Sequence, residues 1–325
     1  MSWRQRALAF LFPAESDRWL TVLRIGLGLA ILFYAWPLHE DWDYLFAGTG
    51  RGLVSRELFE GLLSTQSPII PRLGWLVWIC QRFGLNESFA LSLAWFSLLG
   101  AGCLLLVGLF SRPAAVIAWF LQLAAAKSGG LLSYGADTFV TIGLFYLMIA
   151  PLPDRWSLDW RKRSDRKSDA QLIGFHRRVL QIHLCFIYFF AGLTKCLGGG
   201  WWNGANIWRA LTLPPFDILP IPWVASLSPL LPAVGIAVCL METSYAFLIW
   251  SRWSRRVVLY CACAMHVAIG LLMGMYLFAL IMLVLNIAAF GVSEISRETA
   301  HNESEAPAER AAPQIARQSA REWRV

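Results

Sequence analysis

A lysine and three other polar residues share one face of an apolar segment that is long enough to cross a membrane. The segment reads FHRRVLQIHLCFIYFFAGLTK and ends at Lys195. Arg177, Gln181, Tyr188 and Lys195 lie on one helical face, because seven residues complete about two turns. An apolar pocket would favour the neutral amine of Lys195, which can act as a base, whereas a partner such as Asp137 would keep it charged. The sequence leaves both states open.

The residues after Lys195 can build a pocket at the membrane surface. They read CLGGGWWNG, in which the glycines allow a sharp departure from the helix. Trp201 and Trp202 suit the depth of the lipid headgroups. We expect these tryptophans, together with Tyr188 and Asn203, to shape a pocket around the lysine. The simpler interpretation is a lysine that reaches the interface beside an aromatic belt.

Other polar residues are expected at the same outer surface. Lys127 ends one apolar segment and Asp137 begins the next, so both are predicted to lie near Lys195. Cys196 adjoins the lysine, and a neighbouring cation can make a thiol more reactive. The seven cysteines form no CxxC motif, and an odd number cannot all pair within the chain.

A deeper set of polar residues is predicted inside the membrane. Glu242 and His266 both fall roughly 12–14 Å from the inner surface at the rise of a helix. They could contact each other as interhelical hydrogen-bonding partners, as a proton relay or as ligand contacts. Arg24 is expected either to pair with Glu242 or to extend to the inner surface. His183 lies off the polar face, and we expect it to bond to a neighbouring helix.

The composition places these residues in an integral membrane protein. Hydrophobic residues make up 57% of the 325 residues and charged residues only 15%, and several apolar runs can cross a bilayer. The net charge of +7 does not predict a nucleic-acid partner, because the basic residues lie mostly in loops between the apolar runs. No metal-ligand or nucleotide-binding motif occurs in the sequence, so we expect neither a metal nor a nucleotide.

The apolar runs predict an all-α transmembrane bundle of about eight spans. The spans are expected near residues 19–38, 88–110, 113–128, 135–152, 178–197, 228–250, 257–273 and 275–291, the last two separated at Gly274. Basic residues concentrate in the segment 153–178, which the positive-inside rule places in the cytoplasm together with both termini. The loops 39–87 and 198–227 then face outward. An amphipathic segment 1–18 precedes the bundle 19–291, and the polar tail 292–325 is expected to be disordered.

The chain resembles a known family in the residues around Lys195. The pattern RxxLQIHLxFIYFFAGLTKxxxxxWWNG, with RWSLD before it and METSYAFLIW and MHVAIGLLMGMYLF after it, resembles the HTTM family. That family is the membrane domain related to vitamin K-dependent γ-carboxylase, and the resemblance spans about residues 15–291. It implies that Lys195 is the base that deprotonates a reduced vitamin K-like quinone. A glutamate side chain would then lose a proton and capture carbon dioxide. Glu242 and His266 match recurrent family residues without an assigned role.

The chain also departs from the carboxylase pattern. A further functional histidine of the carboxylases is missing, since Ala136 or Asp137 stands near its place, and no large β-rich portion follows residue 291. The resemblance to smaller bacterial members implies the cytoplasmic (inner) membrane, with the active face toward the periplasm or exterior. Such members resemble maturation factors for secreted peptides or partners of thiol oxidoreductases. A non-catalytic assembly factor and a transporter-like bundle that uses Glu242, His266 and Arg24 therefore remain alternatives to the quinone enzyme.

Overall fold

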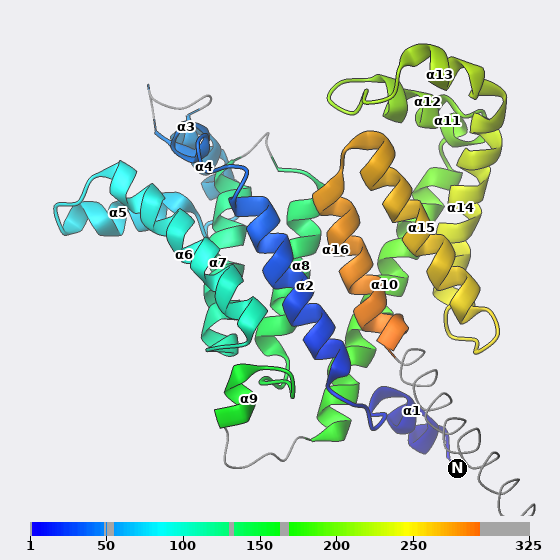
Figure 1. Cartoon of the computed structure of the whole chain (residues 1–325), viewed down its shortest axis with the longest axis horizontal. Coiled ribbons are helices and arrows are strands. Elements are labelled where there is room, and N and C mark those ends of the chain that lie inside the picture. The colour runs from blue at the N-terminus through cyan, green and yellow to red at the C-terminus, as the bar shows by residue number, and fades with distance from the viewer. Residues whose placement is uncertain (1, 49, 51–54, 130–132, 163–168, 293–325) are drawn as a thin grey trace, which may run out of the picture.

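The fold is a bundle of helices. The computed structural model describes residues 2–48, 50, 55–129, 133–162 and 169–292, and every regular element in these ranges is helical. Long helices run side by side through the molecule, and shorter helices gather at its two ends (Figure 1). The tail beyond residue 292, which we expect to be disordered, lies outside the described ranges.

Eight of the described helices occupy the positions of the eight predicted spans. They are α2 (Arg18–Ala35), α6 (Glu87–Val107), α7 (Ser111–Ser128), α8 (Gly135–Ile149), α10 (Ala170–Cys196), α14 (Leu231–Leu248), α15 (Arg255–Met273) and α16 (Tyr276–Asn286), which continues as the π-helical turn Ile287–Gly291. Among the described residues, five helices are long and apolar enough to cross a membrane: α2, α6, α10, α15 and the helix Ser228–Leu248 that contains α14. The apolar helices α8 and α16 are shorter, and α7 belongs to neither group. The count of eight spans and the cytoplasmic placement of both termini stay predictions.

The short helices separate into two sets at opposite ends of the bundle. Helices α1 (Trp3–Leu11) and α9 (Leu158–Lys162) lie at one end in Figure 1. At the other end lie α3 (Trp42–Phe46), α4 (Arg56–Gln66), α11 (Gly199–Trp202), α12 (Ala205–Thr212) and α13 (Ile221–Ser226). Helix α5 (Leu73–Arg82) packs on α6 and α7. The segments predicted to face inward and outward are therefore at opposite ends.

Glycines with a left-handed backbone end two of the long helices. Gly274 has φ +68° and separates α15 from α16, as expected from the length of the apolar run. Gly108 has φ +70° at the end of α6. The next helix is capped by Asp159, which accepts backbone hydrogen bonds from Phe110 (2.9 Å) and Ser111 (2.7 Å). Partial burial raises the pKa of the Asp159 carboxyl, but these N–H groups lower it by more. The pKa of Asp159 therefore lies below its usual range.

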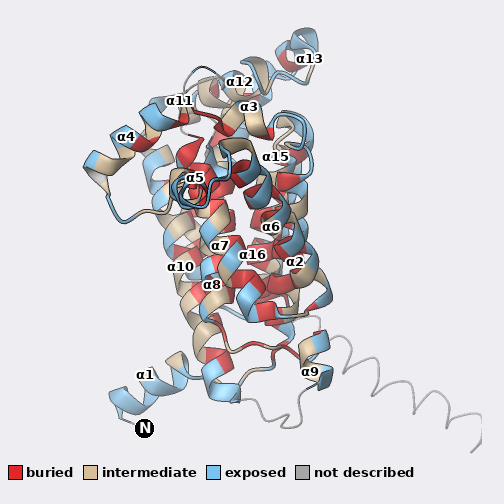
Figure 2. Cartoon of the chain, turned by 90° about the vertical axis from the view of Figure 1, so that its left-hand side faces the viewer, coloured by how far each residue is buried: buried red, intermediate tan, exposed pale blue. Residues whose placement is uncertain are grey.

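Helix α2 packs tightly against α6, α8 and α16. Leu23, Leu27 and Ile31 are fully buried, and the buried residues fill the interior of the bundle in Figure 2. A methyl group added at Gly28 would lie 3.0 Å from the backbone oxygen of Gly102, so α2 and α6 approach each other at small residues. Large apolar side chains on the outside suit contact with lipid, among them Phe96, Phe186, Phe190, Leu240 and Phe247. Burial and length together indicate a multi-pass membrane protein in contact with the bilayer.

Candidate functional site

The candidate site lies where α10 and α14 cross. The close approach is at Gly192, where an added methyl group would lie 2.5 Å from the backbone nitrogen of Thr243. Only a glycine leaves room for the second helix there. Near this crossing, Nζ of Lys195 lies 2.5 Å from Oε2 of Glu242, with side-chain exposures of 22% and 8%. The lysine therefore has a carboxylate partner, which is Glu242 and not the Asp137 considered from the sequence.

The residues that follow α10 turn back over the lysine. Nζ of Lys195 lies 5.3 Å from the ring centroid of Trp201, within the range of a cation–π interaction. Nε1 of Trp202 donates to the backbone oxygen of Cys196 at 2.7 Å, which fixes α11 against the end of α10. Asn203 instead accepts the backbone N–H of Ala205 at 3.0 Å through Oδ1. Trp201 thus lies beside the lysine, Trp202 bonds to the end of α10, and Asn203 is engaged at the start of α12; the pocket around the lysine stays a prediction.

Tyr188 and His266 belong to a chain of hydrogen bonds deeper in the bundle. Tyr245 donates to Oδ1 of Asn286 (2.8 Å), and Nδ2 of Asn286 donates to the hydroxyl of Tyr188 (2.8 Å). The Tyr188 hydroxyl lies 2.6 Å from Nε2 of His266. The oxygen of this hydroxyl accepts from Asn286 and shares one hydrogen bond with Nε2, in which donor and acceptor follow the tautomer of His266. Nδ1 is buried and has no hydrogen-bond partner among the described residues.

Glu242 and His266 therefore do not form the pair that their depth predicts. Glu242 bonds to Lys195, and His266 bonds to Tyr188. Both side chains still contact α10. The polar stripe predicted on that helix faces α14, α15 and the end of α16. Its inner members, Arg177 and Gln181, both donate to the backbone oxygen of Ala289, at 3.0 and 2.5 Å. That carbonyl lies in the π-helical turn, where the usual helical bonding is interrupted.

Arg24 lies at the opposite end of the bundle and has a different partner from the one predicted. Its Nε is 2.6 Å from Oδ2 of Asp154, and both side chains are completely buried. Nη1 donates to the backbone oxygens of Leu105 (2.5 Å) and Leu106 (3.0 Å). Asp154 also accepts the hydroxyl of Thr21 at 2.7 Å. The predicted pairing of Arg24 with Glu242 is wrong, since a full set of partners holds it near the end of α6.

His183 has the interhelical partner that was expected. Its Nδ1 lies 2.9 Å from the hydroxyl of Tyr146 on α8. The neutral phenol satisfies one ring nitrogen and joins α10 to α8. This arrangement agrees with a structural histidine.

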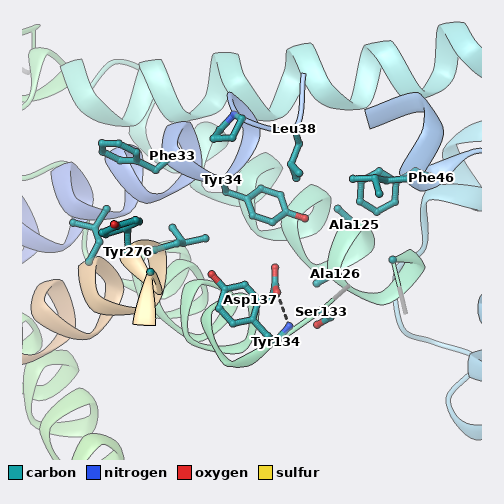
Figure 3. A pocket seen from close by; sticks show the side chains of 16 residues that line it. Phe33, Tyr34, Leu38, Phe46, Ala125, Ala126, Ser133, Tyr134, Asp137 and Tyr276 are labelled. Carbon is teal, nitrogen blue, oxygen red and sulfur yellow. Dashed lines mark hydrogen bonds between the residues drawn. The ribbon is translucent and has the colours of Figure 1, made fainter. Parts of the chain in front are cut away.

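Asp137 lines a separate cavity of about 630 Å³ between α2, α7, α8 and α16, at the end of the bundle where α3 lies (Figure 3). Its carboxylate accepts Nε2 of Gln122 at 3.2 Å and the backbone N–H of Tyr134 at 2.9 Å. Tyr34 and Tyr134 line the same cavity (Figure 3). Apolar and aromatic side chains form most of the rest of the lining, including Phe33, Leu38, Phe46 and Tyr276.

The structure does not bring Lys127, Asp137 and Lys195 into one site. Lys195 does not line the cavity, and Lys127 is exposed near the end of α7. Phe278 stands between the two regions, with its ring centroid 5.6 Å from that of His266 and 5.8 Å from that of Phe139 on α8. The cavity and the Lys195–Glu242 pair are two neighbouring features of the same end of the bundle.

Sequence reasoning missed several residues of these networks. Asn286 is a polar residue inside an apolar span, and this signal alone marks it as a residue in need of a partner. Asp154 gave no such signal, because it lies in a charged loop sequence where an acid is ordinary. Only its burial beside Arg24 reveals its role.

The fold and the site together define a multi-pass helical membrane protein with an ion pair between two helices at one end of the bundle. Comparison with family models identifies the family: the model of the HTTM domain matches residues 91–292, which is more than half of the chain. The chain belongs to the HTTM domain family and is thus a membrane protein of the carboxylase-related family. The match includes Lys195, Glu242 and His266. Comparison with curated proteins and with solved structures finds no match in either set.

Proposed function

We propose that this protein transfers a proton from a hydroquinone substrate at the Lys195–Glu242 pair, at the outward-facing end of the bundle. The observation that carries the proposal is the 2.5 Å contact between Nζ and Oε2 of the two residues. Both are largely withdrawn from solvent, and Lys195 keeps some exposure through which a substrate can approach. Paired ionisable groups inside a membrane protein are costly and are typical of functional sites.

The pairing suggests a division of work between the two residues. Lys195 forms an ion pair with a carboxylate, and a lysine in an ion pair is a poor base. Glu242 is then the group that accepts the proton of the substrate hydroxyl. The ammonium of Lys195 stabilises the negative charge left on the substrate oxygen. One proton moves from oxygen to carboxylate, and no electron is transferred in this step.

The surroundings fit a flat, apolar substrate that carries oxygen atoms. The indole of Trp201 lies over Lys195 and offers an aromatic surface beside the charge. The buried Nδ1 of His266, which lacks a partner among the described residues, would gain one from a substrate oxygen. Family membership supports the same class of substrate, because the carboxylases that the sequence resembles use a reduced quinone.

Native mass spectrometry and lipid extraction of the purified protein test the proposal. We expect a quinone-class lipid to co-purify with the wild type and to be lost or weakened in Lys195→Ala. Lys127→Ala is the matched control, because this lysine is exposed and lies outside the pair. The absence of a quinone from the wild type, or equal retention in all three proteins, would overturn the proposed site.

The division of work has its own test in the rate at which dissolved oxygen, the oxidant in the assay, oxidises the hydroquinone. Glu242→Gln keeps the size of the side chain but removes the acceptor, so we expect the rate to fall by about 10²–10⁴-fold. Lys195→Arg keeps a positive charge and should retain more activity than Glu242→Gln. The opposite order would identify Lys195 as the base, which is the role that the carboxylase resemblance implies.

The outer helices favour a second candidate, a non-catalytic assembly factor for a secreted peptide. Trp223, Ile221 and Ile218 are more than half exposed in and beside α13. Such a patch suits a protein or lipid contact. A wild type without quinone that captures a co-expressed secreted peptide by photo-crosslinking through position 223 would favour this candidate over the enzyme.

A further inference from the structure

Two cysteines face each other across the crossing of α10 and α14. The two helices run in opposite directions, so a step of one turn forward on α10 matches a step of one turn back on α14. The register is fixed at Gly192, which contacts Thr243, and by Tyr188, whose ring stacks on Tyr245 with centroids 4.0 Å apart. Cys196 follows Gly192 by four residues, and Cys239 precedes Thr243 by four. The register therefore places Cys196 opposite Cys239.

The contacts of the two cysteines agree with this register. Sγ of Cys196 lies 3.6 Å from Oγ1 of Thr243. The same hydroxyl donates to the backbone oxygen of Cys239 at 2.8 Å. The two thiol groups are also close enough to interact with each other. Antiparallel helices that approach closely at a glycine can bring two cysteines within the short span of a disulfide.

The two thiols differ in their access to solvent. Cys239 is completely buried, whereas Cys196 is half-buried and adjoins Lys195 at the end of α10. The thiolate is the reactive form in exchange with a disulfide, and an external molecule can reach only an accessible one. Cys196 therefore suits the attack on an external molecule, and Cys239 suits the second step inside the protein.

We propose that Cys196 and Cys239 form a reversible disulfide that joins α10 to α14 beside the Lys195–Glu242 pair. The oxidant is an external disulfide. The thiolate of Cys196 attacks one of its sulfur atoms, forms a mixed disulfide and releases the first thiol. The thiolate of Cys239 then attacks Sγ of Cys196 and releases the second thiol. The protein loses two electrons and two protons, and the external disulfide takes up both as it becomes two thiols.

This bond would act on the candidate site through Lys195. Its formation moves Sγ of Cys196 from Thr243 toward Cys239 and fixes the end of α10 next to the lysine. The reduced and oxidised forms would then hold Lys195 and Glu242 differently. The dithiol itself does not depend on the hydroquinone activity, so the two proposals can fail separately.

Peptide mapping tests the disulfide in the full-length protein. Trypsin cleaves after Lys195, Arg209 and Arg252, which places Cys196 in peptide 196–209 and Cys239 in peptide 210–252, each as the sole cysteine. The protein is treated with oxidised glutathione or with a phosphine reductant, blocked with N-ethylmaleimide and digested. We expect peptides 196–209 and 210–252 joined by a disulfide after oxidation and both alkylated after reduction.

Three variants complete the test. The cross-linked peptide should persist in Cys103→Ser, the matched control, because Cys103 is exposed on α6 and lies outside the pair. It should be lost in Cys196→Ser and in Cys239→Ser. Full alkylation of both peptides from the oxidised wild type would overturn the proposal. Glutathione that remains on Cys196 without transfer to Cys239 would overturn it as well. The mapping of the wild type is sufficient to refute the proposal. The outcome therefore does not depend on whether each variant folds.

Discussion

The ion pair of Arg24 and Asp154 offers a quantitative test of the packing that positions the site. Both side chains are completely buried, and Arg24 makes four hydrogen bonds, two to the carboxylate and two to backbone oxygens at the end of α6. Replacement of one partner leaves the other charge buried without compensation. We therefore expect Arg24→Met and Asp154→Asn each to lower the free energy of unfolding by about 3–5 kcal/mol.

The double variant should be far less damaging than the sum of the single changes. It carries no buried charge, and with both ionic partners replaced together the main loss is that of the donors to the carbonyls of Leu105 and Leu106, at about 0.5–1.5 kcal/mol each. The expected loss is then about 1–3 kcal/mol. The two single changes sum to about 6–10 kcal/mol, so the coupling should be at least about 3 kcal/mol.

Denaturant titration in detergent micelles, followed by tryptophan fluorescence, measures these free energies. Lys127→Ala is the control, because this side chain is exposed and a surface substitution should change the free energy of unfolding by no more than about 0.5 kcal/mol. The reasoning would be refuted if either single variant lost less than about 1 kcal/mol of unfolding free energy. It would also be refuted if the loss in the double variant equalled the sum of the two single losses. The double variant should also retain any quinone that the wild type binds, because Arg24 lies at the other end of the bundle from Lys195.

Three further predictions concern other contacts of the bundle. Gly192→Ala places a methyl group against the α14 backbone and should destabilise the protein by about 1–3 kcal/mol in the same titration, whereas Gly199→Ala enters open space and should change little. Tyr245→Phe leaves the buried Oδ1 of Asn286 without its donor and should cost about 1–3 kcal/mol; an unchanged unfolding midpoint would argue against the hydrogen-bond chain. Because the pKa of Asp159 is lowered in the folded protein, its stabilisation is complete above its unfolded value of 3.8 and is lost as the pH falls below that value. In Asp159→Asn the unfolding midpoint should therefore fall less between about pH 5 and about pH 3 than it does in the wild type. An equal fall in the two proteins would contradict the stabilising role of the Asp159 carboxylate.

The sequence predicted the helices well because their signals are local. The length of each apolar run, the break at Gly274 and the polar stripe from Arg177 to Lys195 depend on the periodicity of a single segment. The structure confirms the break and shows the stripe facing neighbouring helices. His183 could also be interpreted correctly, since it lies off that stripe.

The partners of the charged residues depended on contacts between distant segments. Depth in the membrane suggested that Glu242 meets His266 or Arg24, but depth does not say which helices adjoin or how they are rotated. The tight approach at Gly192 allows α10 to pack on α14. This packing makes Glu242 the ion-pair partner of Lys195. The sequence by itself determined that a cation ends a long apolar helix. Only the tertiary structure decided which carboxylate lies against it, because steric fit between helices sets that choice and the order of residues along one helix does not.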